Sequence, residues 1–169
     1  GSKFKSKRHL ANRFLREQNE IEFKLIDLND AATQDNILHV FRRWEEQKIA
    51  ENKSYEIKHE ELALSRLLNT SNDHKLILSG LFLNGVMVGF SLDEILANNY
   101  AISHFLKADT AYKGIYEYLN EEVAKHLLSC GVELWNWEQD LNIEGLRKLK
   151  LSYRPVKFLK KYKVHYHHN

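Results

Sequence analysis

Apolar residues recur at helical spacing in the first third of the chain. A leading basic helix is predicted over residues 3–18, where lysines and arginines flank an apolar side. A second helix is predicted after Thr33, which we expect to cap it, and a third over residues 59–68. The positions assigned to the buried sides of these helices are Phe4, Leu10, Phe14 and Leu15, then Ile37, Val40, Phe41 and Trp44, and finally Leu62, Leu67 and Leu68.

Alternating and continuous apolar runs predict the strands. One strand is expected over residues 21–28, between the first two helices. Two runs over residues 75–96 surround Asn84-Gly85, the dipeptide most typical of a two-residue β-hairpin turn. Further strands are predicted over residues 99–109, 132–139 and 158–167.

Two more helices separate these later strands. The first has an apolar stripe at every fourth residue, with Asp109 or Thr110 as its expected N-cap and Gly131 as its end. Its stripe consists of Ile115, Leu119, Val123 and Leu127. The second runs over residues 146–153, capped by Asp140 or Asn142, and Pro155 ends it.

The predicted order is a leading helix followed by β-α-α-β-β-β-α-β-α-β. This order is the topology of the GNAT superfamily of N-acyltransferases, so we expect an α/β (α+β) fold with a mixed, mostly antiparallel central sheet flanked by helices. Fold alone does not fix function.

Composition is that of one globular domain. The chain has 169 residues, 43% of them hydrophobic and 28% charged. No apolar run approaches the roughly 18 residues of a membrane span, and the N-terminus lacks the apolar core of a signal peptide. The single cysteine, Cys130, favours a reducing cytoplasmic location. The leading Gly-Ser pair is typical of a cloning remnant, so we expect the natural protein to begin further upstream.

Positive charge is concentrated at both ends of the chain. Residues 1–16 and residues 147–169 contain lysines and arginines but no acid, while the acids lie between Glu17 and Glu144. One explanation is a polyanionic partner, such as tRNA or an anionic phospholipid headgroup. The alternative is that these residues form solvated faces of terminal elements.

Several segments resemble one protein family. The stretch NWEQDLNIEGLRKLKLSYRPVKFLKKYKV (residues 136–164) is similar to the closing motif of the bacterial phosphatidylglycerol lysyltransferase C-terminal domain family, and most to its soluble branch. Matching pieces are KRHLANRFLRE, LILSGLFLNGVMVGFSL and HFLKADTAYKGIYEYLNEEVA. The resemblance implies a GNAT-like domain over residues 20–169 behind a junction helix at 1–19, preceded by another GNAT-like half. It also implies aminoacyl transfer from charged tRNA to an amine or hydroxyl acceptor.

The turn before the long helix is where acetyl-CoA-using relatives bind a pyrophosphate through backbone N–H groups. Gly114 fits one glycine position of that pattern, but Tyr116 stands where the pattern has Gly or Ala. Acetyl-CoA or another acyl-CoA is therefore disfavoured as donor, although an anion can still be held there with help from Lys113. Alternatively, Gly114 serves only helix packing.

Strand alternation places Asn136 and Glu138 on one face of the predicted strand 132–139. Because unpaired polar side chains are costly inside a protein, we expect that face to line a polar cleft. Glu138 is the candidate general base that deprotonates the attacking acceptor. Its alternative role is an ion pair with Arg147 or Lys150. Resemblance adds Lys107 and Asp109, at the end of the preceding strand, as cleft residues.

A basic stripe of Arg147, Lys150 and Arg154 is predicted on the last helix, where it can hold a phosphate or a carboxylate or simply be solvated. Tyr153 falls where some GNAT enzymes place a general acid for the leaving group; its alternative is a packed tyrosine. No metal site is expected from the terminal histidines His165, His167 and His168, which lack ligating partners. We assign no role to His104.

Two classes of function follow. The first is an acyltransferase whose acceptor approaches Asn136 and Glu138, while Lys113, Arg147 and Lys150 engage donor phosphates. The second is a non-catalytic half that positions tRNA or substrate in a two-domain transferase. Acetyl-CoA-dependent N-acetylation is a third, disfavoured possibility.

Overall fold

The computed structural model describes residues 4–52, 59–70 and 75–166. The chain divides into two compact units, residues 1–138 and residues 139–169. The elements of the first unit are α1 (Lys5–Glu17), β1 (Ile21–Ile26), α2 (Ala31–Glu51), α3 (Glu60–Asn69), β2 (Leu76–Leu83), β3 (Val86–Leu96), β4 (Tyr100–Ala108), α4 (Ile115–Ser129) and β5 (Leu134–Asn136). The second unit contains α5 (Glu144–Ser152).

The predicted order of elements is confirmed except at its end. Residues 158–166 of the expected final strand form no strand, and residue 167 lies outside the described residues. A strand is stable only beside a hydrogen-bonded neighbour. Within the part of the chain that the structure describes, no strand pairs with this segment, and its residues 158–166 are all exposed.

The sheet has the strand order β1-β2-β3-β4-β5. The first four strands pair antiparallel, and β5 pairs parallel with β4, so the prediction of a mixed, mostly antiparallel sheet is confirmed. The β2–β3 hairpin turns at Asn84 (φ 49°) and Gly85 (φ 76°). Positive φ at both central residues is the type I′ geometry that matches strand twist, which explains why the sequence has Asn-Gly here.

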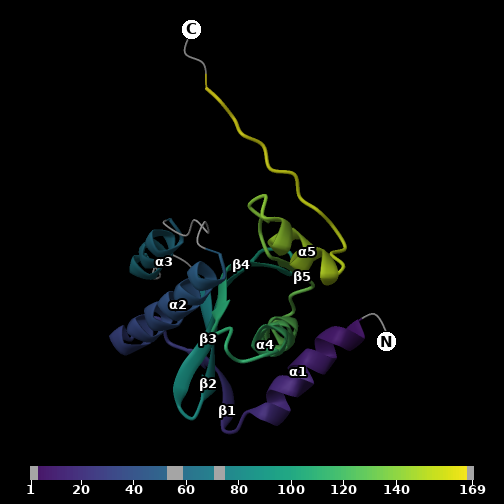
Figure 1. The fold of residues 1–169 in the computed structure, drawn as a ribbon. Coiled ribbons are helices and arrows are strands. Elements are labelled where there is room, and N and C mark those ends of the chain that lie inside the picture. The colour runs from purple at the N-terminus through teal and green to yellow at the C-terminus, as the bar shows by residue number, and fades with distance from the viewer. Residues whose placement is uncertain (1–3, 53–58, 71–74, 167–169) are drawn as a thin grey trace. The chain divides into compact units, whose positions relative to one another are not determined.

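Helices cover both faces of this sheet (Figure 1). One apolar cluster joins α2 and α3 to the sheet through Ile37, Phe41 and Leu64, among others. The other joins α1 and α4 to the opposite face. The predicted stripe of α4 is confirmed, because Ile115, Leu119, Val123 and Leu127 are all buried in that second cluster.

Several expected helix ends lie elsewhere. Asp30, not Thr33, caps α2, since its carboxylate accepts from the Ala32 N–H at 3.3 Å. Thr33 instead donates its hydroxyl to Asp30 at 3.0 Å, which explains its burial. On α3, Leu64 and Leu68 are buried while Leu62 is 48% exposed, so the predicted buried side of that helix was partly wrong. The predicted end of α4 at Gly131 (φ 82°) is confirmed.

Strand β1 forms one edge of the sheet, beside β2. Two of its outward side chains form an ion pair, with Lys24 Nζ 2.8 Å from a Glu22 carboxylate oxygen. The same ammonium lies 4.5 Å from the centroid of the Phe82 ring on β2. The edge is thus charged on its exposed side and anchored to its neighbour by a cation–π contact.

Within the described ranges, none of the helices combines the length and apolar character needed to cross a bilayer.

Candidate functional site

Strands β4 and β5 run together for only three residues. Tyr100, Ala101 and Ile102 pair with Leu134–Asn136, after which β4 continues alone on that edge to Ala108. On its other edge β4 remains paired with β3, but the register shifts from Leu92–Phe105 to Asp93–Ser103, so His104 is an extra residue. Such β-bulges re-aim a side chain, and here the bulge follows directly on the parting of the two strands.

His104 lies between two carboxylates. Its Nε2 is 3.0 Å from Oε2 of Glu94 on β3, and its Nδ1 is 3.5 Å from Oε1 of Glu138. The side chains of His104 and Glu94 are about three-quarters covered, whereas that of Glu138 is 37% exposed. The cluster therefore presents a carboxylate to solvent with an imidazole directly behind it.

The position of Glu138 is set by a turn, not by strand alternation. β5 ends at Asn136, and Glu138 has a left-handed backbone (φ 53°), so the predicted strand over residues 132–139 is too long. The Asn136 side-chain oxygen accepts from the Glu138 N–H at 2.8 Å, which closes this turn. Asn136 and Glu138 do lie together, but the contact is between side chain and backbone.

Behind this cluster lies a buried acid on β3. Asp93 accepts the Ser91 hydroxyl at 2.6 Å and the Trp135 indole N–H at 3.0 Å. Burial raises the pKa of Asp93 to about 6, against the opposing effect of these donors. Trp135 also packs edge-on against Trp137, so the start of the segment after β5 is held from two sides.

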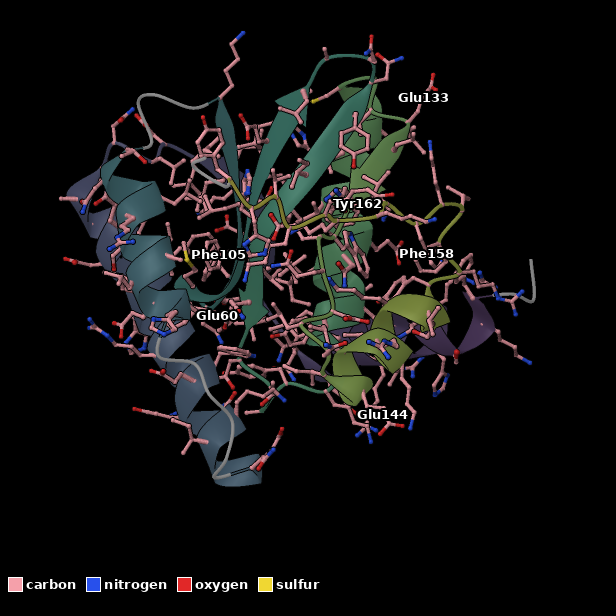
Figure 2. The ribbon with its side chains drawn as sticks, turned by 90° about the horizontal axis from the view of Figure 1, so that it is seen from above. Glu60, Phe105, Glu133, Glu144, Phe158 and Tyr162 are labelled. Carbon is pink, nitrogen blue, oxygen red and sulfur yellow. The ribbon has the colours of Figure 1, made fainter. Side chains whose placement is uncertain are left out.

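Lys107, near the end of β4, is buried beneath α3. Its ammonium is 2.9 Å from a Glu60 carboxylate oxygen and 3.4 Å from the centroid of the Trp44 ring. Burial lowers the pKa of Lys107, while Glu60 acts in the opposite direction. In Figure 2, Glu60 and Phe105 mark the side of the sheet that α2 and α3 cover. Lys107 is therefore bound to that helical layer.

Asp109 is likewise bound to α2. Its carboxylate accepts from the Gln47 amide, from the Arg43 guanidinium at 3.2 Å and from the Ala111 N–H at 2.9 Å. Burial alone would raise the pKa of Asp109, but these hydrogen bonds outweigh it and the net shift is downward. Gln47 also accepts from the Thr110 N–H and hydroxyl, so this loop is fixed to the helix.

The start of α4 is closed by α1. Gly114, not Asp109 or Thr110, is the N-cap, with φ 89°. A Cβ at this position would lie 2.1 Å from the carbonyl oxygen of Leu10 on α1, so the glycine permits a close approach between the two helices. Lys113, immediately before it, is exposed.

Tyr116 turns its ring back onto β4. Its hydroxyl accepts from the Ala108 N–H at 3.3 Å. The Asp109 N–H bonds to the Val88 carbonyl on β3 at 2.8 Å, so the Ala108 N–H faces the opposite edge, where β5 has already parted from β4. Tyr116 therefore covers a backbone donor on that edge of β4.

The remaining candidates belong to the second unit. Arg147 donates to the Asp140 carboxylate and, at 2.9 Å, to the Asn142 side-chain oxygen, and it lowers the pKa of Asp140. Lys150 donates to the Gln139 carbonyl at 2.7 Å. Both cations thus hold the loop that precedes α5.

The cap predicted for α5 was wrong. Ile143 is the N-cap and makes no side-chain cap bond, while Asp140 accepts from the Asn142 N–H at 3.0 Å. Tyr153 is the C-cap and is partly buried. His165 is exposed, and His167 and His168 lie outside the described residues.

Three residues of the cluster were missed by sequence reasoning: Asp93, Glu94 and His104. The acidic pair Asp93-Glu94 interrupts an apolar strand, which was a usable signal of a polar site. The bulge that brings His104 beside Glu94 depends on pairing between two strands, and no local pattern shows it.

A mixed sheet with a pair of helices on each face, whose edge strand parts from its parallel neighbour, defines a GNAT-like acyltransferase fold. The family described as phosphatidylglycerol lysyltransferase, C-terminal, matches residues 1–165. The chain belongs to this family, which makes it an acyltransferase-type domain.

Solved structures share this fold. A conserved protein of unknown function from Bacteroides thetaiotaomicron is 30% identical, with a TM-score of 0.80 over 93% of this chain and 51% of that one. The C-terminal domain of a protein described as a lysylphosphatidylglycerol synthetase from Agrobacterium fabrum is 16% identical, with a TM-score of 0.62 over 92% of this chain and 52% of that one. The chain thus spans about half the length of both.

The fold extends to acetyltransferases. PaiA N-acetyltransferase of Thermoplasma acidophilum, solved in complex with coenzyme A, has a TM-score of 0.57 at 21% identity, over 78% of this chain and 87% of that one. Comparison with curated proteins finds no match.

Proposed function

We propose that this domain transfers an aminoacyl group from a charged tRNA to an amine or hydroxyl acceptor. The observation that carries the proposal is the exposed Glu138 carboxylate beside His104, at the point where β4 parts from β5. Membership of the lysyltransferase family supports the class of donor. Direct attack on an activated ester needs a base and a positioned carbonyl, and it needs no enzyme-bound intermediate.

Glu138 is the proposed general base. It removes a proton from the acceptor amine or hydroxyl as that atom attacks the aminoacyl carbonyl, and the ester bond to the tRNA then breaks. Asn136 fixes the backbone of Glu138 through its 2.8 Å hydrogen bond. Tyr153 is the proposed acid that protonates the departing ribose oxygen. Lys107 and Asp109 support the end of β4 through α2 and α3.

Phosphates of the donor are proposed ligands of Lys113, Arg147 and Lys150. Lys113 is exposed and ready for such contact. Arg147 and Lys150 already donate to the loop before α5, so a phosphate would have to replace Asp140 and the Gln139 carbonyl as acceptor. Exposed basic residues of α1 add to the attraction for a polyanion.

Acetyl-CoA is disfavoured as donor on two grounds. Strand β4 offers a backbone edge beyond Ile102, but the Tyr116 hydroxyl already occupies the Ala108 N–H there. At the start of α4, the Leu10 carbonyl crowds Gly114 on the side where glycine would otherwise leave room. A carbonyl oxygen there also repels a pyrophosphate.

The test is transfer of radiolabelled amino acid from a set of charged tRNAs to small amines, hydroxyl compounds and phosphatidylglycerol. We expect Glu138→Gln to abolish turnover while tRNA binding persists. The matched control is Glu133→Gln, since Glu133 is an exposed acid on the same segment, bonded to Asn99 at 3.3 Å. Unchanged turnover in Glu138→Gln removes that residue from the mechanism.

A second candidate is a binding half that positions tRNA for catalysis elsewhere, favoured by the fact that the chain spans about half of the Bacteroides structure. Salt-dependent tRNA binding without turnover by the wild-type chain would support it. Calorimetry with CoA tests the third possibility, acetyl-CoA-dependent N-acetylation. Micromolar binding of CoA would support that function and contradict the role given to Tyr116.

A further inference from the structure

His104 is held at the site by the fold itself. It is the extra residue of the β4 bulge, and it contacts one acid from β3 and another from the turn after β5. Removing the bulge would shift the register by one residue and turn this side chain to the other face of the sheet. The imidazole therefore reaches both carboxylates only because the bulge exists.

The two ring nitrogens have different partners. An ionised carboxylate can only accept, and of the two contacts the one between Glu94 Oε2 and Nε2, at 3.0 Å, is the closer, so in the neutral ring we place the proton on Nε2. In the neutral ring, Nδ1 then carries the lone pair, and it faces Glu138 Oε1 at 3.5 Å. Glu94 thus selects the tautomer that can accept a proton from the direction of Glu138.

Among the described residues, the charged groups in contact with this ring are two acids, Glu94 on β3 and Glu138 after β5, and the buried Asp93 on β3 acts on the ring through its charge. A proton arriving on Nδ1 creates an imidazolium whose positive charge is stabilised by these carboxylates. The arrangement suits temporary storage of a proton taken from the exposed carboxylate.

We propose that His104 is a positioning residue that acts through Glu138 as a proton relay, with Glu94 fixing its tautomer. This inference rests on the proposed function. The acceptor N–H or O–H bond breaks, its proton passes to Glu138 and on to Nδ1 of His104, and the acceptor atom bonds to the aminoacyl carbon. The ester C–O bond then breaks, and the ribose oxygen takes up a proton. Finally His104 releases its proton to water, so protons balance.

The activity test compares His104→Gln and Glu94→Gln with wild type in the transfer assay. We expect kcat of His104→Gln to fall about 100-fold, the size typical of a lost acid–base function, with KM changed less than about threefold. The pH profile of kcat should also differ from that of wild type. The control is His39→Gln, which alters an exposed histidine on α2. Thermal unfolding of each variant separates misfolding from lost relay function.

A second readout does not need activity. In ¹⁵N NMR of histidine-labelled protein, neutral His104 should be the Nε2–H tautomer in wild type and should lose that preference in Glu94→Gln. A Nδ1–H tautomer in wild type, or a signal indifferent to Glu94, overturns the inference even if no substrate is found. Normal kcat and an unchanged pH profile in His104→Gln, with active wild type, overturn it while leaving the proposed function intact. Inactivity of wild type with every charged tRNA counts against the proposed function alone.

Discussion

The indole N–H of Trp135 donates to Oδ1 of Asp93 at 3.0 Å and so joins the edge strand β5 to the buried interior of β3. The ladder between β4 and β5 has three residue pairs, so this side-chain bond is an important part of the attachment of β5. The acceptor of this bond is a fully buried acid, whose ionisation is disfavoured by burial.

Asp93 should make stability depend on pH. Its pKa is raised from 3.8 to about 6 in the folded protein, so the folded state binds the proton more tightly than the unfolded chain. The contribution of Asp93 to the free energy of unfolding is therefore greatest below pH 4, and it is lost as the pH rises from about 4 to about 6. A shift of this size corresponds to about 3 kcal/mol.

Asp93→Asn removes that ionisation. Relative to wild type, we expect the free energy of unfolding of the variant to improve by up to about 3 kcal/mol between pH 4 and pH 7. Urea unfolding at both pH values measures the difference, and other titrating groups cancel in the comparison. A difference that is the same at both pH values would show that Asp93 titrates normally.

Lys107 should make stability increase with pH in the alkaline range, which is the opposite of the effect of Asp93. Burial lowers its pKa below 10.5, so the unfolded chain binds the proton more tightly and wild-type stability rises as pH increases towards 10.5. Lys107→Met keeps the volume beneath Trp44 and abolishes the charge. We expect it to lie within about 1 kcal/mol of wild type at pH 7, because Glu60 is 34% exposed and can be solvated.

Unfolding at pH 7 and pH 10 tests this expectation. The free energy of unfolding of wild type should increase relative to that of Lys107→Met between pH 7 and pH 10. Lys107→Ala should be the less stable variant at both pH values, because it leaves a cavity against the Trp44 ring. If Lys107→Met instead becomes more stable relative to wild type over this interval, then the effect of Glu60 on the pKa of Lys107 outweighs that of burial.

Gly114→Ala should detach α1 from α4. The new Cβ would lie 2.1 Å from the Leu10 carbonyl oxygen, and the alanine would also have to adopt a left-handed backbone conformation. Gly131→Ala is the matched control, since its φ of 82° is similar and nothing lies within 4 Å of the new atom. We expect the control to lose about 1 kcal/mol and Gly114→Ala at least about 2 kcal/mol more. Equal losses of stability in the two variants, measured by thermal unfolding, would show that α1 can shift away from the new Cβ at little cost.

Asn136→Ala should impair transfer through the backbone of Glu138. The lost 2.8 Å hydrogen bond closes the turn that holds Glu138 at φ 53°. A bond worth about 1 kcal/mol corresponds to a roughly five- to tenfold fall in kcat, with the melting temperature little changed. Asn99→Ala, which removes a side-chain bond to Glu133 instead, serves as control. Equal kcat in the two variants would contradict this role.

Local patterns in the sequence sufficed for most of the fold. The Asn84-Gly85 turn and the four-residue stripe from Ile115 to Leu127 each depend on neighbours in the chain, and both were predicted correctly. The predicted helix caps were wrong where two polar residues lie close together near the start of a helix. Asp30 rather than Thr33 caps α2 because the helix begins a turn earlier than its apolar pattern.

The site was harder to predict because its geometry depends on strand register. Glu138 was identified from its segment, but the neighbours that define its chemistry come from β3 and β4. His104 meets Glu94 only through a one-residue bulge between distant segments. The expected final strand failed for a related reason, since an alternating sequence becomes a strand only where a partner edge is available.

The charged edge of the sheet at β1 has a consequence for association. An exposed strand edge invites pairing with another molecule, and a lysine there makes such pairing costly because its charge would be buried. Lys24 is held in place by Glu22 and by the Phe82 ring, so it cannot easily swing aside. Replacing it with an apolar residue would turn β1 into a template for edge-to-edge aggregation, whereas the natural edge keeps the sheet from growing on that side.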